Sequence, residues 1–416
     1  MNRLAHVCSI GARATLVLCF LAFPMSVALA NVALLLTLLM WLLSLTGAPA
    51  RADLREALRN PLAAPALALF AWVVIAVAWS PAQSPDALGF LQKYLKFLLV
   101  PMFIALLQDA RTRRHCWHAF IVALLLTLAI TWLSVWVDIP WTKARRMALA
   151  ADHTVFKDHI SQGLMMTLFA TIAAFVGFTT RRRTLRAVCT ALWLLATAAI
   201  LALSQGRTGY LAWGVSSGVF ALTVAFAHSR RAVLGAVAGL GAVLALAFAL
   251  SPVLQERVIA AWTEARTAGL EAAPGAVVTS AGARVEMTRF AIDRSWKAPL
   301  LGHGTASYPV LAKQHFTTTE WCSVVCPHPH NQFLFFLVEQ GVIGLLLFLW
   351  FIAAIVREGW RHDPPRRAFA LAFVATLCAA SVTHSAFWLS TESHCLILMS
   401  ALTMASLRAR RAPVRA

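Results

Sequence analysis

Residues 326–356 carry the clearest signal for the fold of this chain and read CPHPHNQFLFFLVEQGVIGLLLFLWFIAAIV. From Asn331 onward the run is long and apolar enough to cross the hydrocarbon core of a bilayer, which takes about 20 residues of helix. The polar residues before it stop abruptly, which places them at the edge of the membrane. The stretch therefore predicts a transmembrane helix that begins beside a histidine-rich loop.

Apolar runs of this kind recur along the chain, which has 416 residues, 60% of them hydrophobic and 13% charged. A water-soluble domain of this size would expose a largely apolar surface, so these values exclude that class. We predict an all-α polytopic membrane protein with about 12 helices. The first helix is expected to be retained rather than removed as a signal peptide, because the second follows at once. The expected spans are residues 12–28, 30–47, 62–79, 90–107, 117–137, 159–179, 184–203, 208–227, 232–250, 331–356, 367–386 and 390–407.

The distribution of arginine predicts that both chain ends are cytoplasmic, because loops rich in Lys and Arg stay on that side of a membrane. The expected organisation is helices one to nine in residues 1–250, a periplasmic loop or cap in 251–329, and helices ten to twelve with a basic cytoplasmic tail in 330–416. The membrane is expected to be the cell inner membrane. The net charge of +19 follows from this topology and from contact with anionic lipid, so nucleic acid is not expected as a partner.

Three connections on the periplasmic side break the charge rule, and a basic residue there needs another reason to be present. Arg145 and Arg146 follow the fifth helix, Arg207 lies between the seventh and eighth, and Arg284 belongs to the long loop. Guanidinium groups suit phosphate, which they bind through several hydrogen bonds at once. The alternative for Arg207 is an arginine that reaches up to lipid headgroups, and for Arg145 and Arg146 it is contact with acidic lipid.

The long loop is expected to contain local structure, because structureless connections of this length are uncommon in compact bundles. Residues 252–262 have the spacing of an amphipathic helix, and residues 284–296 are again helical in pattern. A stretch of small residues at 272–283 separates the two. Residues 299–304 are rich in turn formers and return the chain toward the membrane. A small helical cap is therefore predicted.

Two of the eight cysteines, Cys322 and Cys326, fall in this loop rather than in an apolar span. On the oxidising side of the membrane they can form a short-loop disulfide. The alternative is a zinc site completed by His315, His328 or His330, although the C-x3-C spacing is not a usual zinc motif.

His330 directly precedes the apolar run. The N-terminus of a helix disfavours an added positive charge, so the imidazole is expected to be neutral and able to accept a proton, as a general base must. The alternative is structural: Asn331 or His330 caps the helix and His328 only decorates the loop.

Three short motifs follow one another in the second half of the chain. Ser204-Gln-Gly-Arg207-Thr-Gly209 has the pattern Ser-x-x-Arg-x-Gly, and Gly282-Ala-Arg284 with the following residues 292–304 has the patterns Gly-x-Arg and Pro-Leu-x-Gly-x-Gly. His330-Asn331 is followed after nine residues by Gly341-Val-Ile-Gly344. These motifs resemble those of the O-antigen ligase family, within a superfamily of O-antigen ligases, polymerases and protein O-oligosaccharyltransferases. The N-terminal helices match the family only in general character.

The resemblance implies a GT-C type glycosyltransferase that moves a glycan from undecaprenyl diphosphate to a hydroxyl of the lipid A core oligosaccharide, on the periplasmic face. His330 would be the catalytic base of a direct displacement, which inverts the anomeric centre. The periplasmic loops contain no Asp-x-Asp pair, so arginines are expected to neutralise the diphosphate without a metal or other cofactor. The expected substrate-binding residues are Arg207, Arg284, Arg145, Arg146 and Asn331.

Three other functions fit parts of this pattern. An O-antigen polymerase would use the same donor but extend another lipid-linked glycan. A protein O-oligosaccharyltransferase is less well matched, because no further domain is seen after the twelfth helix. A transporter of lipid or glycan would show related halves with broken helices near the midplane, and no such duplication is visible.

Overall fold

The structure is a computed structural model that describes residues 3–149, 151–267, 280–317 and 319–409, and within these ranges it contains helices and loops but no strand. Every expected span overlaps one helix or two helices in sequence, and the first, at residues 12–28, ends beyond α1. These are α1 (Arg3–Ala22), α2 (Val27–Ser44), α4 (Ala63–Ile75) with the 3-10 helix η1 (Ala76–Trp79), α5 (Ser84–Leu98) with α6 (Val100–Leu107), α7 (Ala110–Leu133), α9 (His159–Thr179), α10 (Arg183–Leu201), α11 (Arg207–Phe226), α12 (Arg230–Leu250), α17 (Gln332–Trp360), α18 (Pro364–Thr383) and α19 (Ser390–Ala409).

Ten helical segments in the described part of the chain are long and apolar enough to cross a membrane, and a pair bent by 84° supplies up to one more. That pair joins α3 (Ala48–Leu58), an amphipathic helix that the sequence analysis did not predict, to α4 and η1. α19 is almost entirely buried and carries Glu392 and His394, so it is more polar than a lipid-exposed span. The chain is a multi-pass membrane protein.

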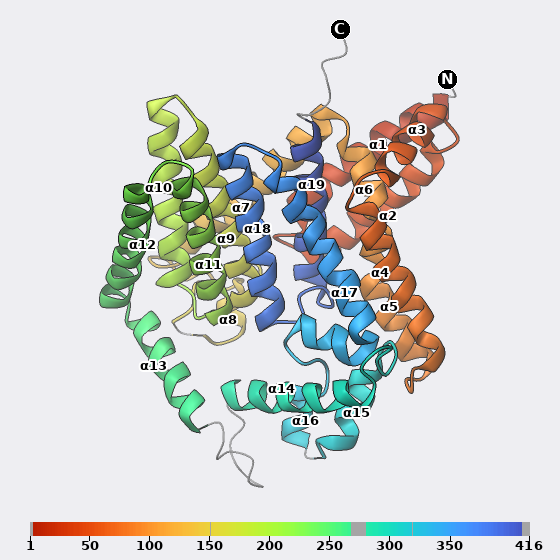
Figure 1. Ribbon diagram of the computed structural model, residues 1–416. Helices are drawn as coiled ribbons and strands as arrows, with labels where there is room; N and C mark the ends of the chain where they lie inside the picture. The colour runs from red at the N-terminus through yellow and green to blue at the C-terminus, as the bar shows by residue number, and fades with distance from the viewer. Residues whose placement is uncertain (1–2, 150, 268–279, 318, 410–416) are drawn as a thin grey trace.

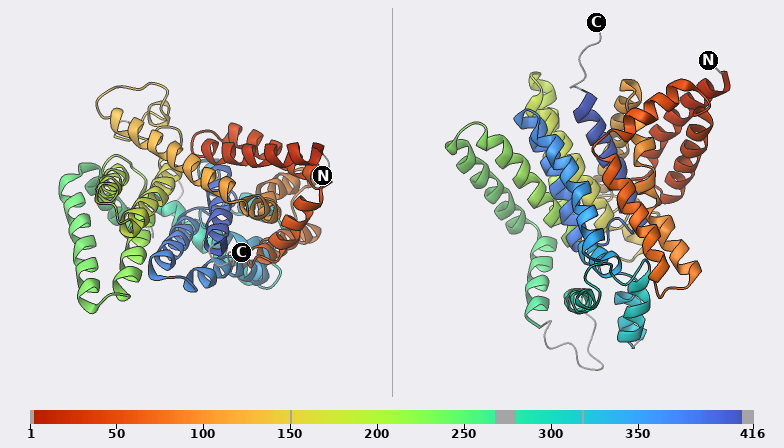
Figure 2. Two further views of the ribbon diagram at one scale, coloured as in Figure 1. Left: turned by 90° about the horizontal axis from the view of Figure 1, so that it is seen from above. Right: turned by 45° about the vertical axis from the view of Figure 1, so that its right-hand side comes forward.

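The helices form a bundle with α17, α18 and α19 in the middle, as seen from above in Figure 2. α1, α2 and α3 lie on one side of this centre, and α10, α11 and α12 lie on the other. α12 has no buried residue, as expected for a helix whose sides face lipid.

Four helices cover one end of the bundle, and we call them the cap: α13 (Pro252–Thr267), α14 (Ser280–Lys297), α15 (Ser307–His315) and α16 (Thr319–Val325). The start of α1 and the end of α19 lie at the opposite end (Figure 1). Both helices predicted in the long loop are present as α13 and α14. Of the small-residue stretch at 272–283, residues 272–279 lie outside the described residues and 280–283 begin α14.

An aromatic core fixes the cap to the bundle. The ring of Tyr308 in α15 meets those of Phe290 in α14 and Phe335 in α17 edge to face, each with centroids 5.6 Å apart. Burial of such rings contributes both apolar area and a favourable edge-to-face geometry. The position of α14 is therefore tied to the first turns of α17.

α17 is interrupted at Gly341, where φ is +65° and ψ is −168°. The carbonyls of Val338 and Glu339 accept hydrogen bonds from the backbone N–H groups of His303 and Gly304, both at 2.9 Å. A Cβ added to Gly341 would lie 2.2 Å from the carbonyl oxygen of Leu300. The predicted turn at 299–304 thus docks into a break in the transmembrane helix, and the break requires glycine.

Candidate functional site

The backbone before α17 holds His330 in an uncommon conformation. Its φ is +50°, in the left-handed region that few residues other than glycine adopt. The next residue, Asn331, caps α17, and its side-chain oxygen accepts hydrogen bonds from the N–H groups of Phe333 (3.0 Å) and Leu334 (3.1 Å). Strained residues persist only where the surrounding structure holds them, and they gather at functional sites. The capping interpretation is therefore correct for Asn331, while His330 precedes the cap in a strained conformation.

Three histidines from two separate segments form what we call the histidine cluster: His328, His330 and His384. His384 is the C-cap of α18. The rings of His330 and His384 are nearly parallel, with centroids 4.8 Å apart, and the rings of His328 and His330 are 4.2 Å apart. The Nδ1 atoms of His330 and His384 are buried and have no hydrogen-bond partner among the described residues. These two nitrogens remain available to a ligand or a proton.

The surroundings keep all three imidazoles neutral near pH 7. Burial, and then the positive charge of Arg284, lower the pKa of His330 to about 4. Burial, with the neighbouring His330, lowers the pKa of His384 to about 3 and that of His328 to about 2. The neutral imidazole expected at His330 thus has a different main cause from the one the sequence suggested: burial comes first, rather than the helix N-terminus.

Arg207 and Arg284 lie in the same region as His330. Arg207, the first residue of α11, makes a two-pronged ion pair with Glu264 of α13, with N–O distances of 2.6 and 3.0 Å. Burial and the charge of Arg207 lower the pKa of Arg284, and the charge of Glu264 opposes them. Because the charge of Arg284 also acts on His330, these residues from distant parts of the sequence are close in space.

The turn before α11 is packed closely against α9. The carboxylate of Asp152 accepts hydrogen bonds from the backbone N–H groups of Thr154 (2.8 Å) and Gln205 (3.1 Å). A Cβ added to Gly206 would lie 2.7 Å from the carbonyl oxygen of His159. Only glycine allows this approach without a shift, so the turn fixes where α11 begins and where Arg207 is presented.

Arg145 and Arg146 lie in a different place. They belong to the short helix α8 (Lys143–Arg146), and both are exposed. Arg145 forms an ion pair with Asp138 at 2.5 Å and lines a hollow of about 230 Å³ that also includes His153. The same hollow is lined by Asp152, whose carboxylate accepts the hydrogen bond from Gln205, two residues before Arg207.

Residues 190–349 match the model of the Wzy_C family, which is described as O-antigen ligase. This part of the chain is an O-antigen ligase domain. It runs from α10 into α17 and contains Arg207, Arg284 and His330. The family covers O-antigen ligases and polymerases, enzymes that act on lipid-linked glycans. No curated protein matches the chain.

Residues outside the O-antigen ligase domain complete the surroundings of its histidine cluster, and the sequence analysis did not identify His384 or Trp388 as site residues. His384 follows α18, and its neighbour Trp388 lies 4.9 Å from the ring of His328, centroid to centroid. The amine of Lys93 in α5 lies 3.6 Å from the centroid of that tryptophan ring. The only local sign of a role for His384 in the sequence is its place at the end of an apolar run.

Two charged residues, Lys157 and Asp158, directly precede α9. Asp158 caps α9 and accepts hydrogen bonds from the N–H groups of Ile160 and Ser161. Its negative charge acts on His384, where it opposes the effect of burial on the pKa. Lys157 is buried beside it, and burial lowers the pKa of this lysine to about 8, against the charges of Glu392 and Asp158.

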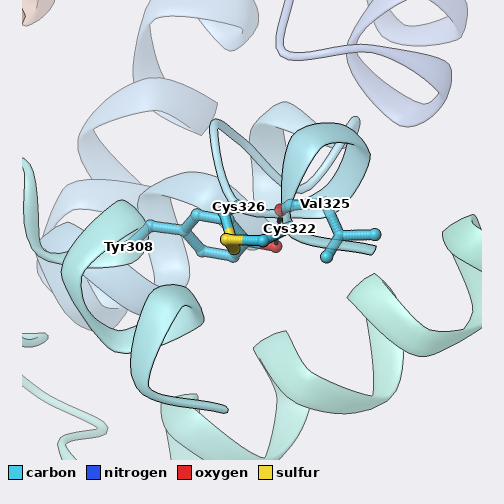
Figure 3. The surroundings of a disulfide bond; sticks show 4 residues. All are labelled: Tyr308, Cys322, Val325 and Cys326. Atoms are coloured by element: carbon cyan, nitrogen blue, oxygen red, sulfur yellow. Dashed lines mark hydrogen bonds between the residues drawn. A yellow bond between two sulfur atoms is a disulfide. The ribbon is translucent and has the colours of Figure 1, made fainter. Parts of the chain in front are cut away.

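Cys322 and Cys326 of the O-antigen ligase domain form a disulfide (Figure 3). It joins α16 to the residue that directly follows this helix. Beside it, the hydroxyl of Tyr308 donates a hydrogen bond to the carbonyl of Val325, at 3.2 Å. The disulfide alternative of the sequence analysis is therefore correct. The zinc site built on these cysteines is wrong, because their thiolates are consumed in the bond.

Proposed function

We propose that the chain is an O-antigen ligase that transfers a glycan from undecaprenyl diphosphate to the lipid A core oligosaccharide, as a step of lipopolysaccharide maturation. The observation that carries this proposal is the convergence of Arg207, Arg284 and the neutral His330 under the cap of a membrane bundle. The O-antigen ligase domain covers all three residues. The convergence puts a base and two guanidinium groups where a lipid-linked substrate can reach them.

His330 is the general base of the proposed reaction. Its buried Nδ1 has no partner within the described chain, and burial with the charge of Arg284 keeps the ring unprotonated at neutral pH. It accepts the proton of the acceptor hydroxyl while that oxygen attacks the anomeric carbon. The bond from this carbon to the diphosphate oxygen breaks on the opposite face, so the anomeric centre is inverted.

Arg207 and Arg284 hold the departing diphosphate. Guanidinium groups bind phosphate oxygens through paired hydrogen bonds and keep their charge at any physiological pH. Arg207 already holds a carboxylate, that of Glu264, in the geometry that suits a phosphate. Two fixed cations can neutralise the leaving group, and we therefore propose a reaction that needs no metal.

The remaining expected residues have secondary parts in this proposal. Asn331 holds the start of α17, and with it the position of His330. Arg145 and Arg146 bind anionic groups of the acceptor, since both are exposed on α8 and Arg145 lines a hollow there. Substrates enter from the lipid of the cell inner membrane, with the cap in the periplasm and both chain ends in the cytoplasm.

The nearest alternative is an O-antigen polymerase, which shares the family and the donor. A transporter is less well supported, because Arg207 and the histidine cluster lie at helix ends near the cap and Arg284 lies in the cap itself.

The deciding experiment is transfer in vitro by purified protein in EDTA, with lipid-linked glycan and rough lipopolysaccharide supplied together. Wild type should produce a ladder on lipopolysaccharide. His330→Ala should slow it by about 10² to 10⁴, the usual contribution of a general base. His315→Ala is the matched control, because His315 is exposed on α15, and it should behave as wild type.

Each other outcome points elsewhere. Lengthening of the lipid-linked glycan without transfer to lipopolysaccharide would identify a polymerase. Loss of activity in EDTA that one added cation restores would disprove metal independence. Equal rates for His330→Ala and wild type would remove His330 from the mechanism.

A further inference from the structure

The histidine cluster has the composition of a transition-metal site. One donor atom from each of His328, His330 and His384 can be chosen so that all three lie within 4.8 Å of one another. The three residues come from the loop before α17 and from the end of α18, so the arrangement exists only in the folded chain. His328 and His384 are less than a tenth exposed, which makes this an internal group and not a surface coincidence.

The donor atoms are available. The Nδ1 atoms of His330 and His384 are buried without a hydrogen-bond partner in the described chain. His328 accepts a long hydrogen bond on Nδ1 from the N–H of His330, at 3.4 Å. A neutral imidazole has one nitrogen lone pair, so this ring must give up that hydrogen bond when it binds a metal. A metal binds the lone pair of an imidazole ring nitrogen. Coordination would also satisfy two polar atoms that the fold leaves without partners.

The donor set decides which ions fit. Three imidazole nitrogens suit Zn²⁺, Co²⁺, Ni²⁺ or Cu²⁺, whereas Mg²⁺ and Ca²⁺ require oxygen ligands. Zinc–nitrogen bonds of about 2.1 Å in a tetrahedron bring the nitrogens to ~3.4 Å from one another. The nitrogens that are farthest apart must therefore approach by about 1.4 Å from the observed 4.8 Å limit. A fourth position would remain for water or a substrate oxygen.

Two positive charges near the cluster disfavour a bound cation, and one negative charge favours it. Arg284 acts on His330, and Lys93 acts on His328. Both disfavour a metal and make it bind less tightly than at three histidines in neutral surroundings. Asp158 acts on His384 with the opposite sign and favours a cation there.

We propose that His328, His330 and His384 bind one divalent ion of the Zn²⁺ class, and that the bound ion inhibits the enzyme. The inhibition rests on the proposed function, since a metal on His330 takes up the lone pair with which the ring would accept the acceptor proton. The binding itself does not depend on it. The bound ion would thus control the reaction without taking part in it.

Binding is tested directly on the full chain, purified with a tag that contains no histidine, stripped with EDTA and desalted. Co²⁺ is titrated while its visible absorption is recorded, and Zn²⁺ is then added as a competitor. Wild type should bind one ion per chain. His384→Ala should bind at least ~10-fold more weakly. His384→Gln, which keeps most of the side-chain volume, should show the same loss and replaces the alanine variant if that variant does not fold. His315→Ala should bind like wild type.

Unsaturable binding, or equal affinity in both His384 variants and wild type, would overturn the site. Transfer assays then separate the two proposals. Zn²⁺ should inhibit wild type, EDTA should reverse the inhibition, and each His384 variant should lose a smaller share of its own activity. Co²⁺ binding with no transfer under any condition would sustain the site and disprove the function. Transfer that Zn²⁺ stimulates would overturn the inhibitory role.

Discussion

Arg207 and Glu264 form an ion pair in which Nη2 lies 2.6 Å from Oε1 and Nη1 lies 3.0 Å from Oε2. The pair joins the first residue of α11 to the cap helix α13. Each group is only about one fifth exposed, so the contact is better shielded from water than a surface ion pair. A donor diphosphate that binds Arg207 must therefore displace the carboxylate of Glu264 or share the guanidinium with it.

Changes at the two ends of this pair should have opposite effects. Arg207→Ala should lower kcat/KM for the lipid-linked donor by about 10- to 100-fold, the value of a charged hydrogen bond. Glu264→Gln should lower the donor KM by roughly 3- to 10-fold, because the neutral amide competes less well for the guanidinium. Steady-state kinetics with varied donor measure both.

Arg289→Ala is the control for loss of a guanidinium in the same region. Arg289 lies on α14, is exposed, and pairs with Glu286 on the same helix at 2.8 Å. Its loss should leave the donor KM unchanged. An increase of the donor KM in Glu264→Gln would show that the ion pair is structural and that the carboxylate of Glu264 does not compete with the donor for Arg207.

Gly341→Ala should destabilise the protein strongly. The residue has φ of +65°, and its added Cβ would lie 2.2 Å from the carbonyl oxygen of Leu300. Strain in this region of backbone space costs about 1–3 kcal/mol before the clash is counted. Thermal unfolding in detergent, followed by tryptophan fluorescence, should show a clear loss of apparent Tm.

Gly214→Ala provides the comparison within a helix. Nothing lies within 4 Å of a Cβ built at Gly214 in α11, so the substitution should leave Tm unchanged or raise it slightly. Equal losses for both glycines would mean that the break in α17 does not constrain the fold.

The sequence allowed the helices to be predicted because an apolar run long enough to span a bilayer is a local property. His330, Arg207 and Arg284 could also be found locally, in short motifs. His384, Glu264 and Lys157 could not, because their roles arise from contacts between segments far apart in the chain. Gly341 lies between these cases: its motif was visible, but only the docked turn at 299–304 explains why glycine is required there.

The disulfide offers a test of which side of the membrane holds the cap. Cys322 and Cys326 are bonded, whereas the other six cysteines are free. Chain denatured without reductant should therefore take up six equivalents of a maleimide, and after reduction it should take up eight. This pattern requires synthesis with the cap in an oxidising compartment.

Two comparisons give this result its meaning. The variant with Cys322→Ser and Cys326→Ser should take up six equivalents under both conditions. Wild type that takes up eight without reduction would argue against a periplasmic cap. Since the loop is short, loss of the bond should cost only about 2 kcal/mol of stability, so the double variant should still fold and can be assayed.

Lys157 should make the stability of the protein depend on pH in the alkaline range. Burial lowers its pKa from an ordinary value of 10.5 to about 8. Between these values the unfolded chain binds a proton that the folded chain does not, so the free energy of unfolding rises as pH increases. The gain from pH 7 to 9.5 should be on the order of 2 kcal/mol.

Thermal unfolding over this pH range measures the effect, because the apparent Tm should rise with pH. Lys157→Met should remove this slope of apparent Tm against pH, whatever its effect at pH 7. The exposed Lys313 on α15 is the control, and Lys313→Met should keep the slope. A slope that persists in Lys157→Met would mean that another group titrates, and that Lys157 keeps an ordinary pKa in the folded protein.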